Sequence, residues 1–119
     1  MNVAAADIDV GIKPENAKRW LKTGKSAFLP EEREWLQTLQ DWGLTDSYRS
    51  MNPQDDRSYS WFDYRSRGFE QDPQSGLRID LILASDPAMS DLVGTGIDFD
   101  ARAFEKPSDH CPIWADFKL

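Results

Sequence analysis

The sequence contains a single histidine, His110, which directly follows an acidic residue, Asp109. Another carboxylate, Asp80, lies in the middle of an apolar run, where burying a charge is costly unless it is paired. A carboxylate that orients an imidazole is a recurring arrangement in hydrolases, and an imidazolium held in this way stabilises charge on a phosphate oxygen. Asp109 adds oxygen ligands of the kind that hard divalent cations prefer. Together these residues predict a phosphoryl-transfer site.

Each of these residues also has an ordinary structural interpretation. Asp80 fits equally well on a strand whose second face meets solvent. A lone histidine is more often structural than catalytic. The residues around the predicted site also supply no evident base for water and few metal ligands. From the pattern alone both interpretations stay open.

Apolar and basic residues accompany the predicted site. Trp61, Leu77 and Ile79 are candidates for an apolar pocket beside it, and core packing is the alternative. A second group could form a basic rim that contacts phosphates, with ordinary solvated charge as the alternative. Its members are Arg65, Arg67, Arg78, Lys22, Lys25 and Lys106.

Alternating apolar residues predict the strands that would position the site. The strongest strand signal covers 77–84, with Asp80 at its centre. A strand over 111–117 follows the Asp-His pair and places Ile113, Ala115 and Phe117 on one side. We also expect strands over 58–62 and 97–102. Loops are predicted over 52–57 and 65–76.

Helices are predicted in the first half of the chain. A helix begins at Pro30, has Glu31 in its first turn and ends before Gly43. Its apolar stripe predicts core packing for Trp35, Leu36, Leu39 and Trp42. Residues 14–21 form either a short helix or an irregular loop. Helices followed by strands predict an α+β or α/β sandwich.

Composition narrows the class of protein. The 119 residues carry a net charge of −7, which argues against holding DNA by bulk electrostatics but allows a nuclease with a local basic rim. No stretch is long and apolar enough to span a membrane. The only cysteine, Cys111, excludes an internal disulfide, favours a cytoplasmic location and is expected to be a small buried hydrophobe.

Several sequence blocks closely resemble the bacterial exonuclease III family, in the family's order and from end to end. These blocks are 18–21 (KRWL), 23–25 (TGK), 28–35 (FLPEEREW), 42–44 (WGL), 60–66 (SWFDYRS), 76–81 (GLRIDL) and 105–110 (EKPSDH). The family belongs to the endonuclease/exonuclease/phosphatase superfamily. The resemblance implies a four-layered α/β sandwich of two packed sheets flanked by helices. Residues 1–119 are expected to form its C-terminal half, with the N-terminal half absent.

The resemblance also implies an activity. The family is expected to hydrolyse phosphodiesters of double-stranded DNA with Mg²⁺ or Mn²⁺, by incision 5′ to abasic sites, 3′→5′ exonuclease action and removal of 3′-blocking groups. By this resemblance His110 stabilises the scissile phosphate, Asp80 orients His110, and Asp109 lies at the metal and phosphate centre. Asn2 matches the Asn of a Gly-Asp-x-Asn motif that positions water or phosphate. The pocket for the base-free sugar is expected at Trp61, Leu77 and Ile79, with Arg65 and Arg78 toward the DNA.

One departure from the family pattern bears on activity. Met1 occupies the x position of the motif, so the Asp before it is missing. The family's main metal-binding Glu and a catalytic Tyr are not found either. We therefore expect negligible nuclease activity from this chain alone. We also expect its exposed sheet face to self-associate.

Two rival functions stay open. A related enzyme could cleave a phosphoester in a lipid, nucleotide or sugar phosphate, although the blocks at 60–66 and 76–81 favour DNA. A non-catalytic nucleic-acid-binding fragment is the other rival. The missing residues favour it, and the negative charge disfavours tight DNA binding.

Overall fold

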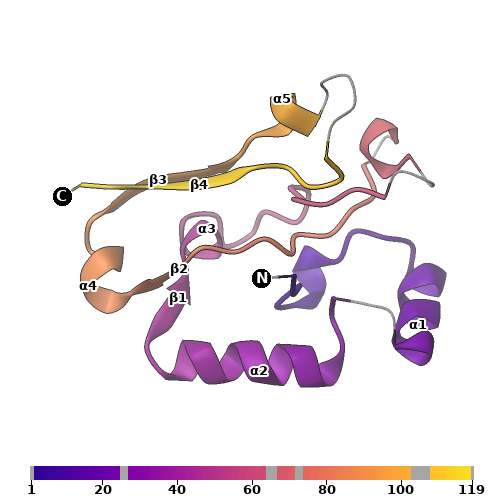
Figure 1. Cartoon of the computed structure of the whole chain (residues 1–119), viewed down its shortest axis with the longest axis horizontal. Helices are drawn as coiled ribbons and strands as arrows, with labels where there is room; N and C mark the ends of the chain where they lie inside the picture. Colours follow the sequence, from indigo (N-terminus) through magenta and orange to yellow (C-terminus); the bar gives the residue numbers. More distant parts are fainter. Residues whose placement is uncertain (1, 25–26, 64–66, 72–73, 103–107, 119) are drawn as a thin grey trace.

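The computed structural model describes residues 2–24, 27–63, 67–71, 74–102 and 108–118. Along the described chain three helical segments come first, and short strands and further short helices follow (Figure 1). In order they are η1 (Asp7–Asp9), α1 (Pro14–Thr23), α2 (Pro30–Asp41), β1 (Leu44–Asp46), α3 (Ser47–Met51), η2 (Gly68–Glu70), β2 (Leu83–Ser85), α4 (Asp86–Met89), β3 (Leu92–Ile97), α5 (Phe99–Arg102) and β4 (Ile113–Phe117).

The described strands form two small antiparallel sheets. β1 pairs with β2, from Leu44 opposite Ser85 to Asp46 opposite Leu83. β3 pairs with β4, and the last matched residues are Ile97 and Ile113. This mixture of helices and antiparallel strands confirms the predicted fold class.

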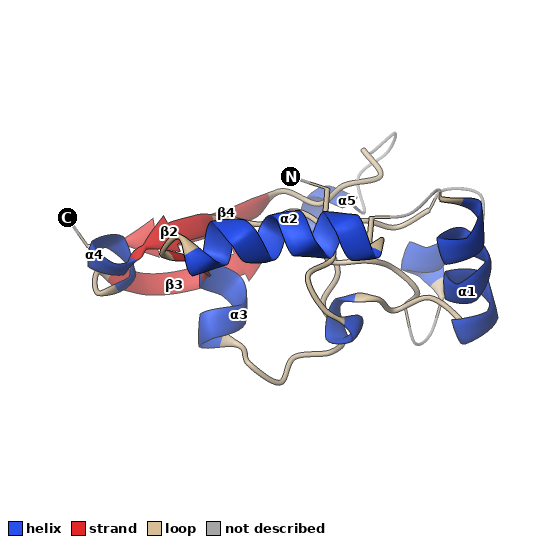
Figure 2. Ribbon diagram, turned by 90° about the horizontal axis from the view of Figure 1, so that it is seen from below, coloured by secondary structure: helices blue, strands red, loops and turns tan. Residues whose placement is uncertain are grey.

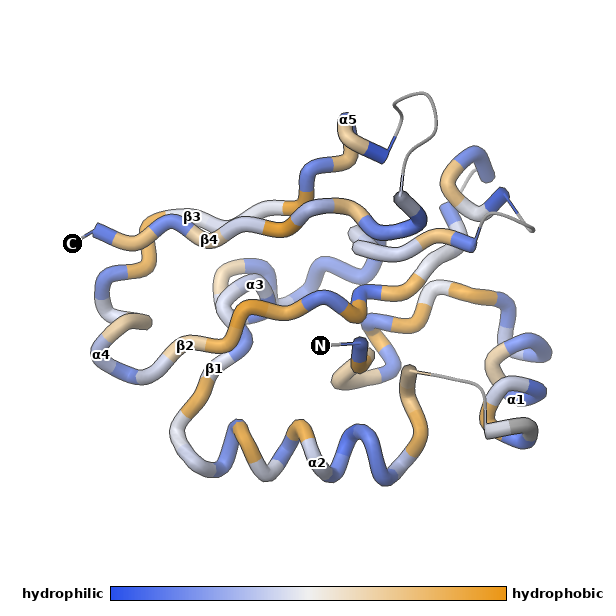
Figure 3. The backbone as a smooth tube through the Cα atoms, in the orientation of Figure 1, coloured by the Kyte–Doolittle hydropathy of each residue, from blue (hydrophilic) through white to orange (hydrophobic). Residues whose placement is uncertain are grey.

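An extended segment over 77–82 runs through the middle of the structure and leads into β2 (Figure 3). Successive residues of this segment form hydrogen bonds with different parts of the chain. The N–H of Val3 donates to the carbonyl of Ile79, and the N–H of Ser47 donates to that of Ile82. The predicted strand over 77–84 is therefore regular only at its end, because no single partner follows it. For the same reason the predicted strand over 58–62 is reduced to bridges at Trp61.

Helix α2 follows its sequence signals, but it packs by a different face. Pro30 occupies the first turn, the Glu32 side chain accepts from the Leu29 N–H at 3.0 Å, and Gly43 adopts a positive φ after the helix ends. Leu36 is buried, whereas Trp35 and Trp42 are 53% and 82% exposed.

The predicted core packing of the two tryptophans is therefore wrong. Trp35 and Trp42 are seven residues apart and share one helix face, while Leu36 points about 100° away. Helix α2 runs alongside the strands (Figure 2) and contacts β1, and Leu36 is the residue of this helix that is buried. The periodicity correctly located an apolar stripe on the helix. Only Leu36, at the edge of that stripe, is buried.

Residues 14–21, for which the sequence allowed either a helix or a loop, form a helix. Helix α1 has Pro14 at its first turn and ends at Thr23, and the next residue, Gly24, has a φ of 73° that suits glycine. Glycine tolerates this left-handed geometry because it has no Cβ.

The predicted strand over 97–102 is wrong. β3 ends at Ile97, and α5 follows it directly. The carboxylate of Asp98 accepts from the N–H of Ala101 at 3.3 Å, so Asp98 starts a helical turn. The strand predicted over 111–117 is confirmed as β4.

Two apolar clusters lie beneath the site. One contains Ala4, Phe28, Leu77 and Ile79, and the partly buried Trp61 packs against it. The other joins Tyr59, Phe62 and Cys111. Cys111 is 2% exposed, which confirms its predicted burial. Within the described ranges, no helix has both the length and the apolar character needed to cross a membrane.

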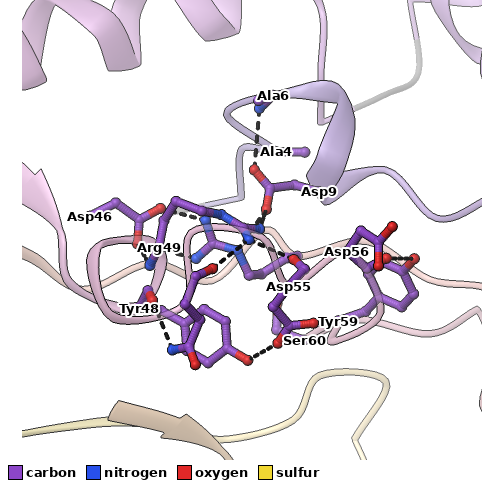
Figure 4. A network of polar contacts seen from close by, with 12 residues as sticks. Ala4, Ala6, Asp9, Asp46, Tyr48, Arg49, Asp55, Asp56, Tyr59 and Ser60 are labelled. Carbon is purple, nitrogen blue, oxygen red and sulfur yellow. Dashed lines mark hydrogen bonds and ion pairs between the residues drawn. The ribbon is translucent and has the colours of Figure 1, made fainter. Parts of the chain in front are cut away.

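A buried ion network joins segments that are far apart in the sequence (Figure 4). Arg78 Nε donates to Asp9 at 2.7 Å, and both its terminal nitrogens donate to Asp46. Arg49 also pairs with Asp9. The Arg78 guanidinium lies over the Tyr48 ring, 5.3 Å from its centre. The network fixes the extended segment against η1, β1 and α3, two residues before Asp80.

Candidate active site at the Asp80–His110 pair

The structure brings Asp80 and His110 together. His110 Nδ1 lies 2.8 Å from Asp80 Oδ2, within hydrogen-bond distance. Asp80 comes from the extended segment, and His110 comes from the loop before β4. Their side chains are 21% and 34% exposed, so the pair is sheltered but can be reached from solvent. Because Nδ1 faces Asp80, Nε2 is the nitrogen that remains for a phosphate oxygen.

A buried serine holds the two sides of this pair at a fixed separation. The Ser60 hydroxyl oxygen accepts from the N–H groups of Ile79 and Asp80, both at 3.0 Å. Its backbone carbonyl accepts from the N–H of Cys111 at 2.6 Å. Ser60 is fully buried and lies between the segments that carry Asp80 and His110. Sequence reasoning missed this role, and only the place of Ser60 beside Trp61 in a predicted strand pointed to it.

Asp109 is fixed at both its backbone and its side chain. Its carbonyl accepts from the N–H of Phe62 at 3.0 Å. Trp61 Nε1–H donates to Asp109 Oδ2 at 3.0 Å. The other oxygen, Oδ1, lies 4.0 Å from His110 Nε2. Asp109, His110 and Asp80 thus form one continuous polar row.

A cavity of about 200 Å³ adjoins Trp61. The indole of Trp20 meets that of Trp61 edge to face, with ring centres 6.0 Å apart. Lys13, Asn16 and Arg19 contribute polar and positively charged groups to the lining. The cavity therefore combines aromatic walls with two basic side chains that suit a phosphate, and Asp63 adds one carboxylate to the lining.

Leu77 and Ile79, predicted to line a pocket, are instead core residues. They are 2% and 5% exposed, and they do not line this cavity. Trp61 packs against the cluster that contains them. Their side chains therefore support the wall of the cavity from beneath.

The predicted contact of Arg78 with DNA is also wrong. Its guanidinium is 1% exposed and is paired with Asp9 and Asp46, so it has no face toward a ligand. Arg67 and Lys22 are exposed, as a rim requires. The other predicted rim residues, Arg65, Lys25 and Lys106, lie outside the described residues.

Asn2 lies next to the central segment. The N–H of the following residue, Val3, donates to the carbonyl of Ile79 at 3.2 Å, one residue before Asp80. Asn2 is exposed. The backbone therefore places Asn2 next to the segment that carries Asp80, and its predicted role stays a prediction.

The described residues do not form a metal site by themselves. Among them, no group of three or more His, Cys, Asp or Glu side chains is arranged to hold a metal ion. Asp109 can offer one oxygen, but its neighbour His110 is engaged with Asp80. The cation that the family resemblance implies is thus only partly accounted for within the described residues.

Cys111, beside His110, is unsuited to chemistry. Burial raises the pKa of its thiol to about 11, and the carboxylates of Asp80 and Asp98 add to this against the opposing charge of Arg102. The reactive thiolate is therefore scarce at neutral pH. Cys111 serves the core.

Comparison with known proteins gives close relatives. The chain is 58% identical over 118 residues to an exodeoxyribonuclease III of Haemophilus influenzae, covering 99% of this chain and 43% of that protein. An exodeoxyribonuclease of Bacillus subtilis is 31% identical over 113 residues, covering 95% of this chain and 40% of the relative. No protein-family profile matches the chain.

Solved structures of similar enzymes superpose closely on this chain. A 3′ phosphatase from Neisseria, bound to a product DNA hairpin, superposes with a TM-score of 0.84 at 42% identity, over 99% of this chain and 42% of that one. An AP endonuclease from Archaeoglobus fulgidus gives a TM-score of 0.84 at 33% identity, over 99% and 43%. The chain thus spans about two-fifths of the length of the proteins that it matches.

Proposed function

Because this chain belongs to the exonuclease III family, we propose that it supplies the Asp–His part of a DNA-repair nuclease active site. The observation that carries the proposal is the 2.8 Å contact between Asp80 and His110 at a sheltered but accessible surface. In the proposed reaction Asp80 holds the imidazole in one orientation. His110 Nε2 then contacts an oxygen of the scissile phosphate and stabilises its developing charge.

The proposed substrate is double-stranded DNA with an abasic site or a blocked 3′ end. The cavity beside Trp61 supports this, because its aromatic wall and its basic side chains suit a base-free sugar and its phosphate. Arg19 and Lys13 supply positive charge for the flanking phosphates, although the chain is acidic as a whole. In this proposal selection is by shape: the site accepts the base-free sugar and not a nucleotide that keeps its base.

A divalent cation, Mg²⁺ or Mn²⁺, is part of the proposal. When bound, it would neutralise charge on the phosphate and lower the pKa of water. In this chain Asp109 would supply one oxygen ligand, and the remaining ligands would come from the portion of the relatives that the chain does not match. Without those ligands and a base for water, rates typically fall by about 10² to 10⁴ for acid–base catalysis alone. The chain by itself is therefore proposed to lack measurable nuclease activity.

A chimera provides the test. The 118 matched residues of the Haemophilus influenzae relative are replaced by this chain, which is feasible at 58% identity. Incision of an abasic duplex is measured with Mg²⁺ for the chimera, for the chain alone and for the chimera carrying His110→Ala. The expected result is internal incision by the unmodified chimera only, at the abasic site, with no internal incision of an intact duplex of the same sequence.

Other outcomes would correct the proposal. Robust cleavage by the chain alone would contradict its dependence on the unmatched portion. A folded chimera that hydrolyses a lipid or sugar phosphodiester but not DNA would support the proposed phosphodiester hydrolysis and contradict the proposed DNA substrate. Binding of abasic duplex without incision, by a chimera with His110 intact, would favour a binding module.

A further inference from the structure

Trp61 occupies the junction between the cavity and the polar row. Its backbone exchanges hydrogen bonds with Leu77 at 2.9 and 3.0 Å and bridges to His110 on the other side. Its indole lines the cavity, and its indole N–H donates to Asp109. Through this one residue the cavity touches the row formed by Asp109, His110 and Asp80.

The indole is held so that its N–H has a fixed direction. Trp20 packs edge to face on one side, and the cluster of Leu77 and Ile79 supports it from another. A fixed donor restrains rotation of the carboxylate it binds. With Asp109 Oδ2 engaged at 3.0 Å, Oδ1 is left toward His110, 4.0 Å from Nε2.

We propose that Trp61 is a positioning residue for Asp109 as well as a wall of the cavity. A ligand that packs on the Trp61 indole then also fixes the orientation of the Asp109 carboxylate. Binding in the cavity therefore places Asp109 in the orientation that the reaction needs. The expected effect on the incision rate rests on the proposed nuclease function. The hydrogen bond from Trp61 to Asp109 does not depend on that function.

The competing interpretation is that Trp61 only fills space beside the substrate. The two interpretations differ in what the loss of the N–H would change. A wall residue affects binding of abasic duplex and discrimination against intact duplex. A positioning residue affects the rate of the bound complex and leaves binding in place.

The first experiment uses this chain without any assay of activity. Indole N–H signals are recorded by ¹H–¹⁵N NMR for the unmodified chain and for Asp109→Ala. The Trp61 signal is expected to shift and to exchange faster with solvent once its acceptor is removed. The Trp42 signal serves as the control, because that side chain is 82% exposed and lies just after α2, outside the elements that carry the site. An unchanged Trp61 signal would overturn the proposal.

The second experiment uses the chimera and a near-isosteric replacement. Trp61 is replaced by β-(3-benzothienyl)alanine, which keeps the ring system and lacks the N–H. Single-turnover incision is expected to slow by about tenfold, which matches the loss of a hydrogen bond to a charged group. The dissociation constant for abasic duplex should stay within about twofold. The same replacement of Trp42 is the matched control and should change neither quantity.

A double-mutant cycle completes the test. With Asp109→Ala already present, the Trp61 replacement should have no further effect on the incision rate, because the two residues act as one unit. An equal slowing in both backgrounds, or weaker binding at an unchanged rate, would overturn the positioning role. A chimera without any incision would contradict the proposed function, and the NMR experiment would still decide the coupling.

Discussion

Arg78 illustrates how one buried charge can be mistaken for a ligand contact. In sequence it is a basic residue beside Asp80, and a basic rim was a reasonable prediction. The structure buries it between Asp9 and Asp46. Burial lowers the pKa of the Arg78 guanidinium, but the hydrogen bonds and charges of the two carboxylates raise it above its ordinary value.

Removal of this arginine should be severely destabilising. We expect Arg78→Met to lower the free energy of unfolding by about 3–5 kcal/mol, because Asp9 and Asp46 would be left buried without their partner. Urea denaturation followed by circular dichroism measures the change. Arg67→Met, at an exposed position, is the control and should stay within about 0.5 kcal/mol. Similar losses for both variants would show that the network does not stabilise the fold.

Cys111 gives a prediction that depends on pH. The pKa of its thiol is raised from an ordinary 9.0 to about 11 by burial, so the folded state keeps the proton more tightly than the unfolded state. The associated stability is present below pH 9 and is lost as the pH rises from there toward 11. At pH 9 the folded chain should carry a roughly fiftyfold smaller thiolate fraction than the unfolded chain.

Alkylation measures this difference. Iodoacetamide labelling at pH 9, followed by mass spectrometry, should be slow in buffer and fast in concentrated urea. Equal rates in both would contradict the burial of Cys111.

At the scale of elements, the sequence indicated where elements lie better than which face they bury. α2 began and ended where Pro30 and Gly43 predicted, because these signals act through the local backbone. The orientation of its apolar stripe depends on what the helix meets, and no local pattern records that. Asp98 similarly converted a predicted strand into α5 by capping a turn.

The buried face of α2 can be tested directly. Leu36→Ala should cost about 2–5 kcal/mol of unfolding free energy, because Leu36 is 1% exposed and its removal leaves a cavity. Trp42→Ala removes a larger side chain, but it should cost less than about 1 kcal/mol because that residue lies in solvent. The two variants are compared by thermal and urea unfolding. A greater loss for Trp42→Ala would restore the original prediction of core packing.

At the scale of the whole molecule, the chain is less compact than a domain of its size. Its radius of gyration is 14.6 Å, against about 13.5 Å expected for this length. Its accessible surface is 7,695 Å², against roughly 6,600 Å² expected for a compact protein of this mass. Large apolar residues contribute to the excess, including Val93 and Trp114 on the β3–β4 sheet, each at least half exposed. Such a surface favours association.

We expect the isolated chain to self-associate through the β3–β4 sheet. Analytical ultracentrifugation should show dimers at micromolar concentration, and Trp114→Glu should shift the population to monomer. Trp42→Glu, which alters the same type of residue just after α2, should leave the dimer intact. A monomer at all concentrations would contradict the expectation.

The part of the site that could be predicted consists of residues within the sequence blocks that resemble the family. Asp80, His110 and Asp109 were identified together, and the structure brings them together. The roles of Ser60 and the Trp61 indole N–H were not predictable, because they arise from segments that meet only in three dimensions. The change of Leu77 and Ile79 from pocket to support has the same origin, since alternation along a strand does not say which side meets a ligand.

The most direct test of the central claim is the coupling between Asp80 and His110. Single-turnover incision of an abasic duplex is measured for the chimera with Asp80→Asn, His110→Ala and both substitutions. If Asp80 acts by orienting His110, the double variant should be no slower than His110→Ala alone. If the two losses multiply, or if His110→Ala leaves the rate unchanged, the pair is not the catalytic unit that this chain supplies.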